Sequence, residues 1–276
     1  MVGVFDLGSN SFISLVLNGK REIMEDIKVT AVAFHVKDGY IQNCEEFKKD
    51  FEDMKNKVKK YTNNIHVFGT AIFRETKNGK DCFDYIKGDH KGKILSGEEE
   101  AHYSYLSVLW DEELNLEHPV VYDLGGGSLE ILDGSSAVSL PLGTKKVKDM
   151  LKERNAEDVV RYIKSLLKAP SGQAAGIGGT FVVIVASIIK EWNLREIHGF
   201  KLTADELDRV MEKLFPMSER EIADLPYIPQ GREKTIKPGM VVVKALLELC
   251  GEIVVSRRGY RYAIGWELEK SVPGGI

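Results

Sequence analysis

The residues best suited to chemistry lie in two similar turns, each beginning with an aspartate that ends an apolar run. The first turn, residues 6–11, contains Asp6, Gly8, Ser9 and Asn10. The second turn, residues 123–128, contains Asp123, Gly125, Gly126, Gly127 and Ser128. Glycines let backbone N–H groups approach an anion, and a carboxylate can hold Mg²⁺ while phosphate completes its shell. Each turn predicts a phosphate and cation site, although a glycine triplet between strands also suits an ordinary hairpin.

The repetition of this turn predicts an internal duplication. Apolar, strand-like residues precede and follow both turns. We therefore expect two like lobes that face each other across a cleft, an N-terminal lobe at 1–115 and a C-terminal lobe at 116–276. The boundary is placed in the polar stretch 111–118, because Pro119 restricts the conformation of the residue before it.

Periodic apolar residues predict the elements that position the turns. Phe47, Phe51, Met54, Val58 and Tyr61 are spaced as one face of an amphipathic helix. Thr70 and Ser96 are expected to cap further helices, and Thr203 and Ser218 each begin a capping box. In the second half we expect strands at 119–124, 128–133, 136–142 and 174–176, a buried helix at 181–192 and a terminal helix at about 262–270.

Six sequence blocks resemble the exopolyphosphatase/guanosine pentaphosphate phosphatase family, within the larger group of actin, sugar kinases and heat-shock chaperone ATPases. The blocks are DLGSNS at 6–11, GTAIFRETKN at 69–78, SGEEEA at 96–101, YDLGGGSLE at 122–130, SLPLG at 139–143 and GIGGT at 176–180. The resemblance implies an α/β fold of two actin-like (ribonuclease H-like) lobes, with mixed sheets flanked by helices and a cleft between them.

The resemblance also implies roles for two side chains. Its second block places a phosphate-contacting arginine at Arg74, whose planar guanidinium fits phosphate oxygens. Its third block contains the catalytic carboxylate. Ser96 and Glu99 have the spacing of a capping box, so Glu99 is expected to be structural and Glu100 to act on the attacking water. Glu99 remains the alternative base.

The expected reaction is metal-assisted hydrolysis of a terminal phosphoanhydride in inorganic polyphosphate or guanosine pentaphosphate. Asp123 and Glu130 are expected to bind Mg²⁺ or another divalent cation, and Asp6 to place metal-bound water. Glu130 thus joins Arg74 and Glu100 in the catalytic set, while the backbone amides of both turns hold phosphate. The resemblance also suggests Arg232 as a substrate contact.

The chain departs from the family pattern in three places. Ile13 stands where the family usually has an arginine, and Leu129 stands where it usually has a threonine. The sequence also ends after two expected lobes, whereas longer members add C-terminal domains. These departures leave the preferred chain length of the substrate open.

Two other functions are compatible with the same residues. A kinase or ATPase of this architecture would share the phosphate turns, since fold alone does not decide activity. A sensor that binds polyphosphate or a nucleotide without catalysis is the second alternative, and the loss of an arginine at Ile13 supports it. The acidic helix start and the block at 69–78 favour the hydrolase.

Composition excludes several classes of partner. The 276 residues carry 38 basic and 42 acidic side chains, a net charge of −4, which argues against nucleic-acid binding. No apolar run reaches the roughly 18 residues of a membrane span, and a strand begins too early for a signal peptide, so we expect a cytoplasmic protein without membrane contact. The sequence leaves open whether the protein is a homodimer.

The cysteines and the basic residues complete the expectations. Cys44, Cys82 and Cys250 are widely separated, which indicates neither a disulfide framework nor a zinc site. Three basic clusters could serve a polyanionic substrate if they met at one groove. They are Lys145, Lys146 and Lys148; Arg232, Lys234 and Lys237; and Arg257, Arg258 and Arg261.

Overall fold

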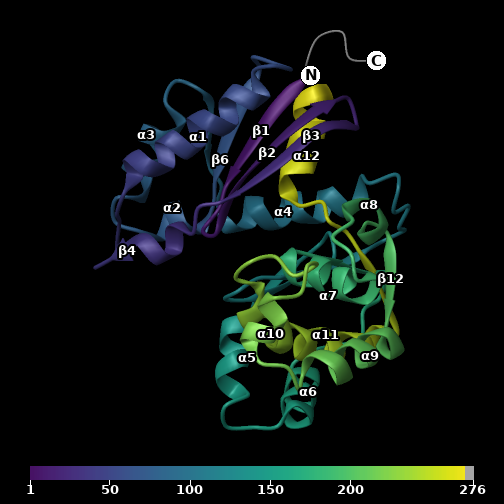
Figure 1. Cartoon of the computed structure of the whole chain (residues 1–276). Helices are drawn as coiled ribbons and strands as arrows, with labels where there is room; N and C mark the ends of the chain where they lie inside the picture. The colour runs from purple at the N-terminus through teal and green to yellow at the C-terminus, as the bar shows by residue number, and fades with distance from the viewer. Residues whose placement is uncertain (271–276) are drawn as a thin grey trace. The chain divides into compact units, whose positions relative to one another are not determined.

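The chain, described from residue 1 to residue 270 in a computed structural model, divides into two compact units. The first unit contains Met1–Tyr103 and the segment that begins at Tyr260, and the second contains Ser104–Gly259 (Figure 1). This division differs in two places from the expected 1–115 and 116–276. The chain passes from the first unit to the second inside helix α4 (Gly97–Leu109). The last helix, α12 (Tyr260–Lys270), belongs with the first unit.

The first unit is built on a five-stranded mixed sheet with the order β3-β2-β1-β6-β7. Its strands are β1 (Val2–Leu7), β2 (Ser11–Asn18), β3 (Arg21–Val29), β6 (Ile65–Gly69) and β7 (Lys91–Ile94). Its helices, besides α12 and the start of α4, are α1 (Cys44–Val58), α2 (Ala71–Glu75) and α3 (Gly79–Lys87), with the short helix η1 (Val32–His35) and a two-stranded ladder of β4 (Val36–Lys37) and β5 (Tyr40–Ile41).

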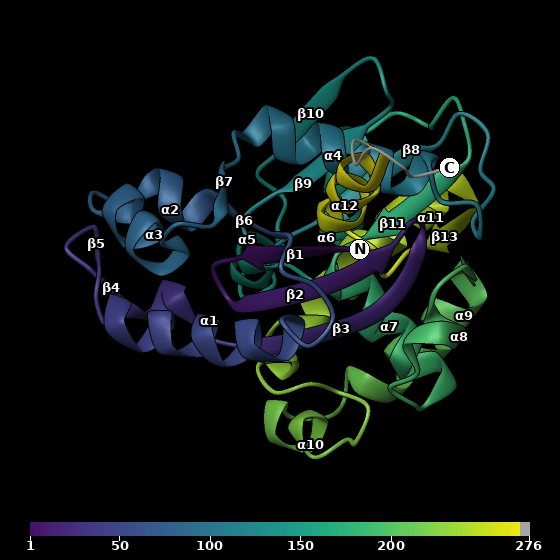
Figure 2. The ribbon, with the colours of Figure 1, turned by 90° about the horizontal axis from the view of Figure 1, so that it is seen from above.

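Helices cover both faces of this sheet. Side chains alternate between the two faces along a strand, so the apolar residues of β1 pack against a helix on each side. Phe5 and Leu7 of β1 join the apolar cluster that includes the buried face of α1. Val4 points to the other face, where Gly265 of α12 packs against it and against Leu17. Figure 2 shows α1 and α12 on opposite sides of β1 and β2. Asp6 shares the face of Val4, so its side chain points toward α12.

A disulfide between Cys44 and Cys82 contradicts the expectation that the cysteines do not pair. It joins the first residue of α1 to α3, with the two Cα atoms 5.8 Å apart. The pairing could not be read from the sequence because 38 residues separate the two cysteines. Packing of α1 against α3 brings them together, and Cys250 is a free thiol.

The second unit is built on a six-stranded mixed sheet with the order β10-β9-β8-β11-β13-β12. Its strands are β8 (Val120–Leu124), β9 (Leu129–Leu132), β10 (Ala137–Leu140), β11 (Ala174–Ile177), β12 (Phe200–Thr203) and β13 (Glu252–Val255). Its helices are α5 (Thr144–Met150), α6 (Ala156–Ser165), α7 (Gly179–Ile189), α8 (Leu194–Ile197), α9 (Ala204–Leu214), α10 (Glu219–Ala223), η2 (Arg232–Lys234) and α11 (Ile236–Cys250).

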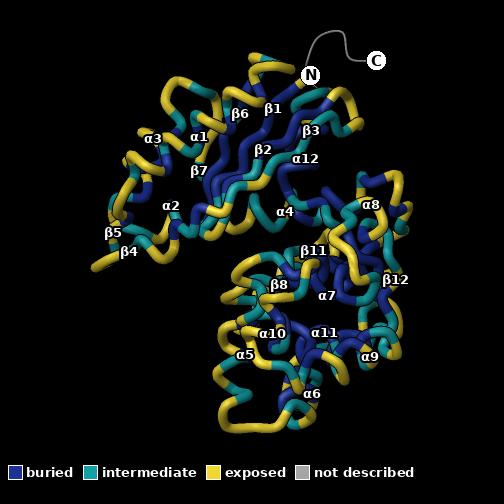
Figure 3. Tube along the Cα trace, in the orientation of Figure 1, coloured by how far each residue is buried: buried dark blue, intermediate teal, exposed yellow. Residues whose placement is uncertain are grey.

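Helices α7 and α11 form the centre of the second core. Both are apolar over most of their length, and Figure 3 shows them buried together with the central strands. The buried helix expected at 181–192 is therefore confirmed up to Ile189, whereas Trp192 lies beyond its end and is exposed. The capping boxes at Thr203 and Ser218 are present, whereas the hydroxyl of Thr70 makes no capping hydrogen bond at α2.

The strand orders confirm the duplication. In each unit the first strand pairs antiparallel with the second, which pairs antiparallel with the third. The first strand also pairs in parallel with the next strand of its sheet, β6 in one unit and β11 in the other. Among the described residues, no helix combines the length and the apolar character that crossing a bilayer requires.

Candidate functional site

The second turn presents backbone donors in one direction. Its ends are closed by a 3.0 Å hydrogen bond from the Gly125 amide to the Ser128 carbonyl. The start of α5 donates to its carbonyls, from Thr144 to Gly125 at 3.1 Å, from Lys145 to Gly126 at 2.9 Å and from Gly143 to Gly127 at 3.3 Å. A trans peptide points its N–H opposite to its C=O. The N–H groups of Gly126, Gly127 and Ser128 therefore point away from α5 and form a concavity suited to an anion.

Gly143 lets α5 approach this turn. A Cβ atom at Gly143 would lie 2.3 Å from backbone atoms of Gly127 and Ser128, closer than any real contact. The backbone of Gly143 is extended, with φ −65°, so an alanine would meet no conformational strain there. Close approach of the two backbones is thus the reason for this glycine.

Asp123 and Glu130 lie directly opposite each other on the antiparallel strands β8 and β9. Like charges in this position repel, unless a cation lies between them. The Ser104 hydroxyl lies 3.5 Å from Asp123 Oδ2, and the Ser139 hydroxyl donates to Glu130 Oε1 at 3.0 Å. Two carboxylates fit Mg²⁺, which takes few protein ligands and keeps water and phosphate oxygens. Within residues 1–270, no three His, Cys, Asp or Glu residues form a metal-binding group.

A second glycine pair adjoins Asp123, and an arginine packs against this pair. Gly178 has φ 93°, a left-handed conformation that favours glycine, and its Cα side faces the Asp123 carboxylate. The guanidinium of Arg232 packs against Gly179, where a Cβ would come within 2.1 Å of Nη2. Burial lowers the pKa of Arg232, a sign that its charge is poorly hydrated. Arg232 thus lies beside the glycine-rich start of α7, and its expected contact with the substrate stays a prediction.

The first turn has the same closure as the second. The Gly8 amide donates to the Ser11 carbonyl at 3.0 Å. The carbonyl of Ser9 accepts from Ala33 at 2.9 Å, so the N–H of Asn10 points the other way. The Asn10 carbonyl likewise accepts from Thr30 at 3.1 Å and from Ala31 at 2.8 Å, so the N–H of Ser11 also points the other way. The two turns therefore match in local structure as well as in sequence, with two N–H groups turned outward here against three in the second turn.

Asp6, before the first turn, is a buried carboxyl group with 9% of its surface exposed. Burial raises its pKa to about 6, and the charges of Glu100 and Glu25 act in the same direction. The positive charge of Arg261 and a hydrogen bond with Tyr260 act against this rise. Ile13 lies directly across from Asp6 on β2, as Glu130 lies across from Asp123 on β9. Ile13 is therefore the residue of the first unit that corresponds to Glu130.

Arg74 and Glu100 form a hydrogen-bonded ion pair in the first unit. Arg74, on α2, donates from Nη1 to Glu100 Oε2 at 3.0 Å and to the Leu95 carbonyl at 2.6 Å. Both side chains are about a third exposed. Glu99 instead completes the capping box with Ser96 and pairs with Lys93. Glu99 therefore has the structural role expected from the sequence. Glu100 does not take part in the capping box, and its carboxylate lies next to Arg74.

The three basic clusters separate into buried and surface residues. Arg258 is buried and pairs with Asp111 at 2.5 Å, and Lys148 pairs with Glu219 at 2.6 Å. The aliphatic part of Lys145 passes Gly126 of the second turn, within 3.6 Å of a Cβ placed there. The sequence pattern gave no sign of Ser104 and Tyr260 and marked Arg261 only as part of a basic cluster, because only the fold brings these residues to the two aspartates.

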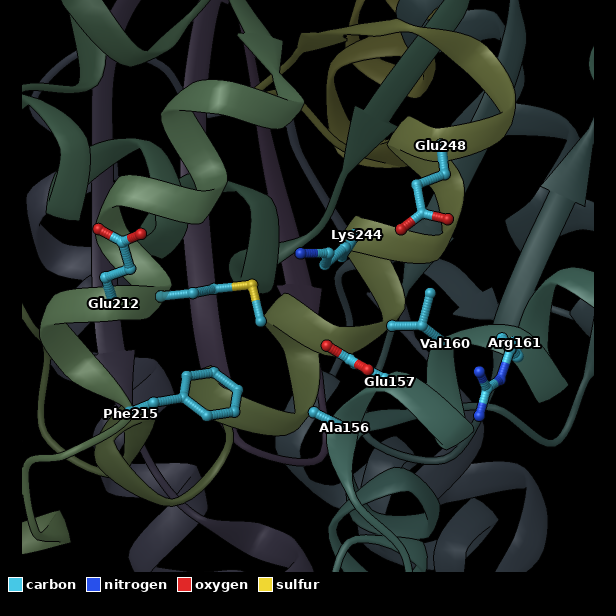
Figure 4. A pocket seen from close by; sticks show the side chains of 9 residues that line it. Ala156, Glu157, Val160, Arg161, Glu212, Phe215, Lys244 and Glu248 are labelled. Carbon is cyan, nitrogen blue, oxygen red and sulfur yellow. The ribbon is translucent and has the colours of Figure 1, made fainter.

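A hollow of about 510 Å³ lies elsewhere in the second unit, between α6, α9 and α11 (Figure 4). Val160, Met211 and Phe215 line it, with charged residues such as Lys244 and Glu248 around them. No residue of the second turn lines this hollow. We assign it no part in phosphate chemistry.

A duplicated α/β fold whose two units carry matching phosphate-type turns defines a protein of the actin-like class. Solved structures share this fold. A Ppx/GppA family member from Aquifex aeolicus matches with a TM-score of 0.82 at 21% identity, over 98% of both chains. An exopolyphosphatase from Cytophaga hutchinsonii matches with a TM-score of 0.81 at 18% identity, over 100% of this chain and 99% of the other.

The sequence pattern of the Ppx/GppA phosphatase family matches residues 36–261. The chain belongs to this family. A guanosine-5'-triphosphate,3'-diphosphate pyrophosphatase from Pseudoalteromonas atlantica is 30% identical over 274 residues, which cover 88% of this chain and 53% of that protein. The chain thus spans about half the length of this curated relative.

Proposed function

We propose that the protein is a phosphohydrolase that releases terminal phosphate from inorganic polyphosphate or guanosine pentaphosphate. Family membership supports this activity. The observation that carries the proposal is the Arg74–Glu100 pair at the start of α4, where a guanidinium and a carboxylate meet at 3.0 Å with both partly exposed. Such a carboxylate can take a proton from water in a hydrolase or from an acceptor hydroxyl in a kinase, and family membership favours water.

Arg74 and Glu100 divide the work on the reacting group. Arg74 stabilises the charge on the transferring phosphoryl group, and its bond to the Leu95 carbonyl fixes the guanidinium in place. Its fork offers five N–H donors, so pairing with Glu100 leaves donors for phosphate. Glu100 orients the attacking water and takes its proton. Asp6 assists by positioning a further water.

The second turn and its two acids hold the substrate. The outward N–H groups of Gly126, Gly127 and Ser128 bind phosphate oxygens, and the corresponding amides of Gly8, Ser9 and Asn10 are assigned the same function. Asp123 and Glu130 hold the cation, which we propose is Mg²⁺. When bound, this ion offsets the negative charge that builds up on the phosphoryl oxygens. Arg232 contacts the substrate beside Gly179.

Phosphate release in the presence of Mg²⁺ tests the proposal. Wild type and Glu100→Gln are compared on polyphosphate, guanosine pentaphosphate and ATP, with Glu99→Gln as the matched control on the same helix. Glu100→Gln is expected to lose a factor of about 10²–10⁴ in kcat, and Glu99→Gln to lose stability more than activity. Full activity of Glu100→Gln would refute the role of this residue. Transfer from ATP to an acceptor would indicate a kinase, and binding without release would indicate a sensor.

A cytoplasmic location and a homodimer remain proposals from the sequence. Cell fractionation and light scattering of the purified protein test them. The Cys44–Cys82 disulfide gives the first of these experiments added weight, because disulfides are rare in reducing compartments. Recovery of the oxidised protein from an oxidising compartment would contradict the cytoplasmic location.

A further inference from the structure

The side chain of Lys145 lies over the backbone of the second turn. A Cβ atom placed at Gly126 would be 3.6 Å from Cε of Lys145 and 4.0 Å from its Cδ. Among residues 1–270, and apart from the chain neighbours of Gly126, no other atom comes within 4 Å of that position. A Cβ atom at Gly127 would have no such neighbour in the same part of the chain. The turn is therefore open above these two glycines, and Lys145 is the side chain that borders the opening.

The far end of this side chain runs along the turn. The backbone N–H of Lys145 donates to the Gly126 carbonyl at 2.9 Å, which fixes the residue beside the turn. Cε lies nearer than Cδ to the Cβ position of Gly126, so the side chain extends toward this glycine rather than away from it. The ammonium group follows directly after Cε. It therefore lies close to Gly126, at the edge of the concavity formed by the outward N–H groups of the turn.

The positive charge of Lys145 is not paired inside the protein. Lys148, on the same helix, forms an ion pair with Glu219. The ammonium of Lys145 makes neither an ion pair nor a hydrogen bond with any residue that the structure describes, and the residue is exposed. A lysine ammonium offers three donors and no acceptor, so its natural partner is an anion. These donors lie beside a turn whose amides also point toward an anion.

We propose that Lys145 binds phosphate oxygens of the substrate at the second turn. Its ammonium adds a positive charge to the uncharged N–H donors of Gly126, Gly127 and Ser128, and hydrogen bonds from a charged donor are the stronger ones. Contact of the aliphatic stem with Gly126 restricts the side chain beforehand, so less entropy is lost when the ammonium binds phosphate. Lys145 raises affinity for a polyphosphate chain and takes no part in bond cleavage. The inference rests on the proposed function in assigning phosphate binding to this turn.

Binding of inorganic tripolyphosphate without turnover tests this role, measured by calorimetry on the full chain in metal-free buffer of low ionic strength. Lys145→Met keeps an apolar stem over Gly126 and removes the charge. It is expected to bind about tenfold more weakly, the lower end for a hydrogen bond to a charged group. Lys145→Arg keeps the charge and should keep most of the affinity. Lys146→Met is the matched control, because it removes the same charge from the neighbouring exposed lysine of α5, and it should bind as wild type does.

Kinetics add a second readout. For Lys145→Met the KM for polyphosphate should rise about tenfold, with kcat changing less, as expected for a residue that acts in binding. Tripolyphosphate affinity of Lys145→Met equal to that of wild type, or an equal loss in Lys146→Met, would overturn the proposal. So would a Lys145→Arg variant as weak as Lys145→Met, because charge would then not be the cause. Calorimetry needs no turnover, so weakened binding in Lys145→Met would uphold the inference even if Glu100→Gln showed that the proposed hydrolysis is wrong.

Discussion

Gly143→Ala should disable the second turn without unfolding the protein. The added Cβ would lie 2.3 Å from the Gly127 carbonyl carbon and the Ser128 nitrogen, whereas ordinary contacts begin near 3.4 Å. The backbone of the turn or of α5 must therefore move by about 1 Å. Alanine is compatible with the extended backbone at this position, so the clash is the whole effect.

A displacement of this size at a binding group costs about 10²-fold in rate, which equals roughly 2.7 kcal/mol of transition-state stabilisation. Overpacking of this kind typically lowers the free energy of unfolding by about 1–3 kcal/mol. We therefore expect kcat/KM for phosphate release from polyphosphate to fall about 100-fold, while urea unfolding still shows a folded protein at room temperature.

Gly172→Ala is the matched control. Its Cβ would meet the His118 carbonyl oxygen at 2.0 Å, a comparable backbone clash in the same unit before β11 rather than at the second turn. The control should lose a similar amount of stability and keep its kcat/KM. If Gly143→Ala kept wild-type activity, or lost no more than Gly172→Ala does, the assignment of the turn to phosphate binding would be refuted.

Three further predictions concern stability. The folded-state pKa of Asp6, about 6 against an ordinary value of 3.8, means that the native state loses stability as pH rises from about 4 to 6. In Mg²⁺-free buffer Asp6→Asn should thus be more stable than wild type by up to about 3 kcal/mol at pH 8 and equal to it near pH 4, and an equal stability at pH 8 would contradict the shift. The Cys44–Cys82 disulfide joins residues 38 positions apart, so its reduction should lower the free energy of unfolding, measured by urea titration, by about 4 kcal/mol. The stability of Cys82→Ala should not change when reductant is added. Arg258→Met leaves the buried Asp111 carboxylate without its guanidinium partner, with His198 as its remaining neighbour at 3.3 Å, and should cost about 3–5 kcal/mol. The double variant Asp111→Leu, Arg258→Met should recover most of that loss, and failure to do so would argue against an electrostatic origin.

Local sequence patterns were sufficient for the parts of the fold that depend on neighbours in the chain. The repeat of the Asp-Leu-Gly turn predicted the duplication, and the spacing of Phe47, Phe51, Met54 and Val58 predicted the buried face of α1. Tyr61 was wrongly included in that face, because α1 ends at Val58 and Tyr61 is exposed. The capping box assigned Glu99 to structure and so singled out Glu100, which the structure places beside Arg74. In each case the contacts that determine the structure join residues a few positions apart in the chain, or a sequence motif identified the partner residue.

Contacts between distant segments could not be predicted. The spacing of Cys44 and Cys82 shows nothing of the packing of α1 on α3, and no periodicity links the segment after Gly259 to the sheet at the start of the chain. The apparent basic cluster at Arg257, Arg258 and Arg261 is divided by this boundary between units. Arg258 neutralises Asp111, whereas Arg261 neutralises Glu25, so sequence proximity was misleading there.

The return of α12 to the first unit has a consequence for synthesis on the ribosome. Ser104–Gly259 is one uninterrupted segment, so we expect it to acquire its structure as soon as it has emerged. The earlier segment must wait for the last helix, and until then the Val4 and Leu17 side of its sheet stays uncovered and open to chaperones. Ribosome-bound chains halted before Tyr260 should accordingly be cut by protease within the first hundred or so residues and resist cleavage in the segment that follows.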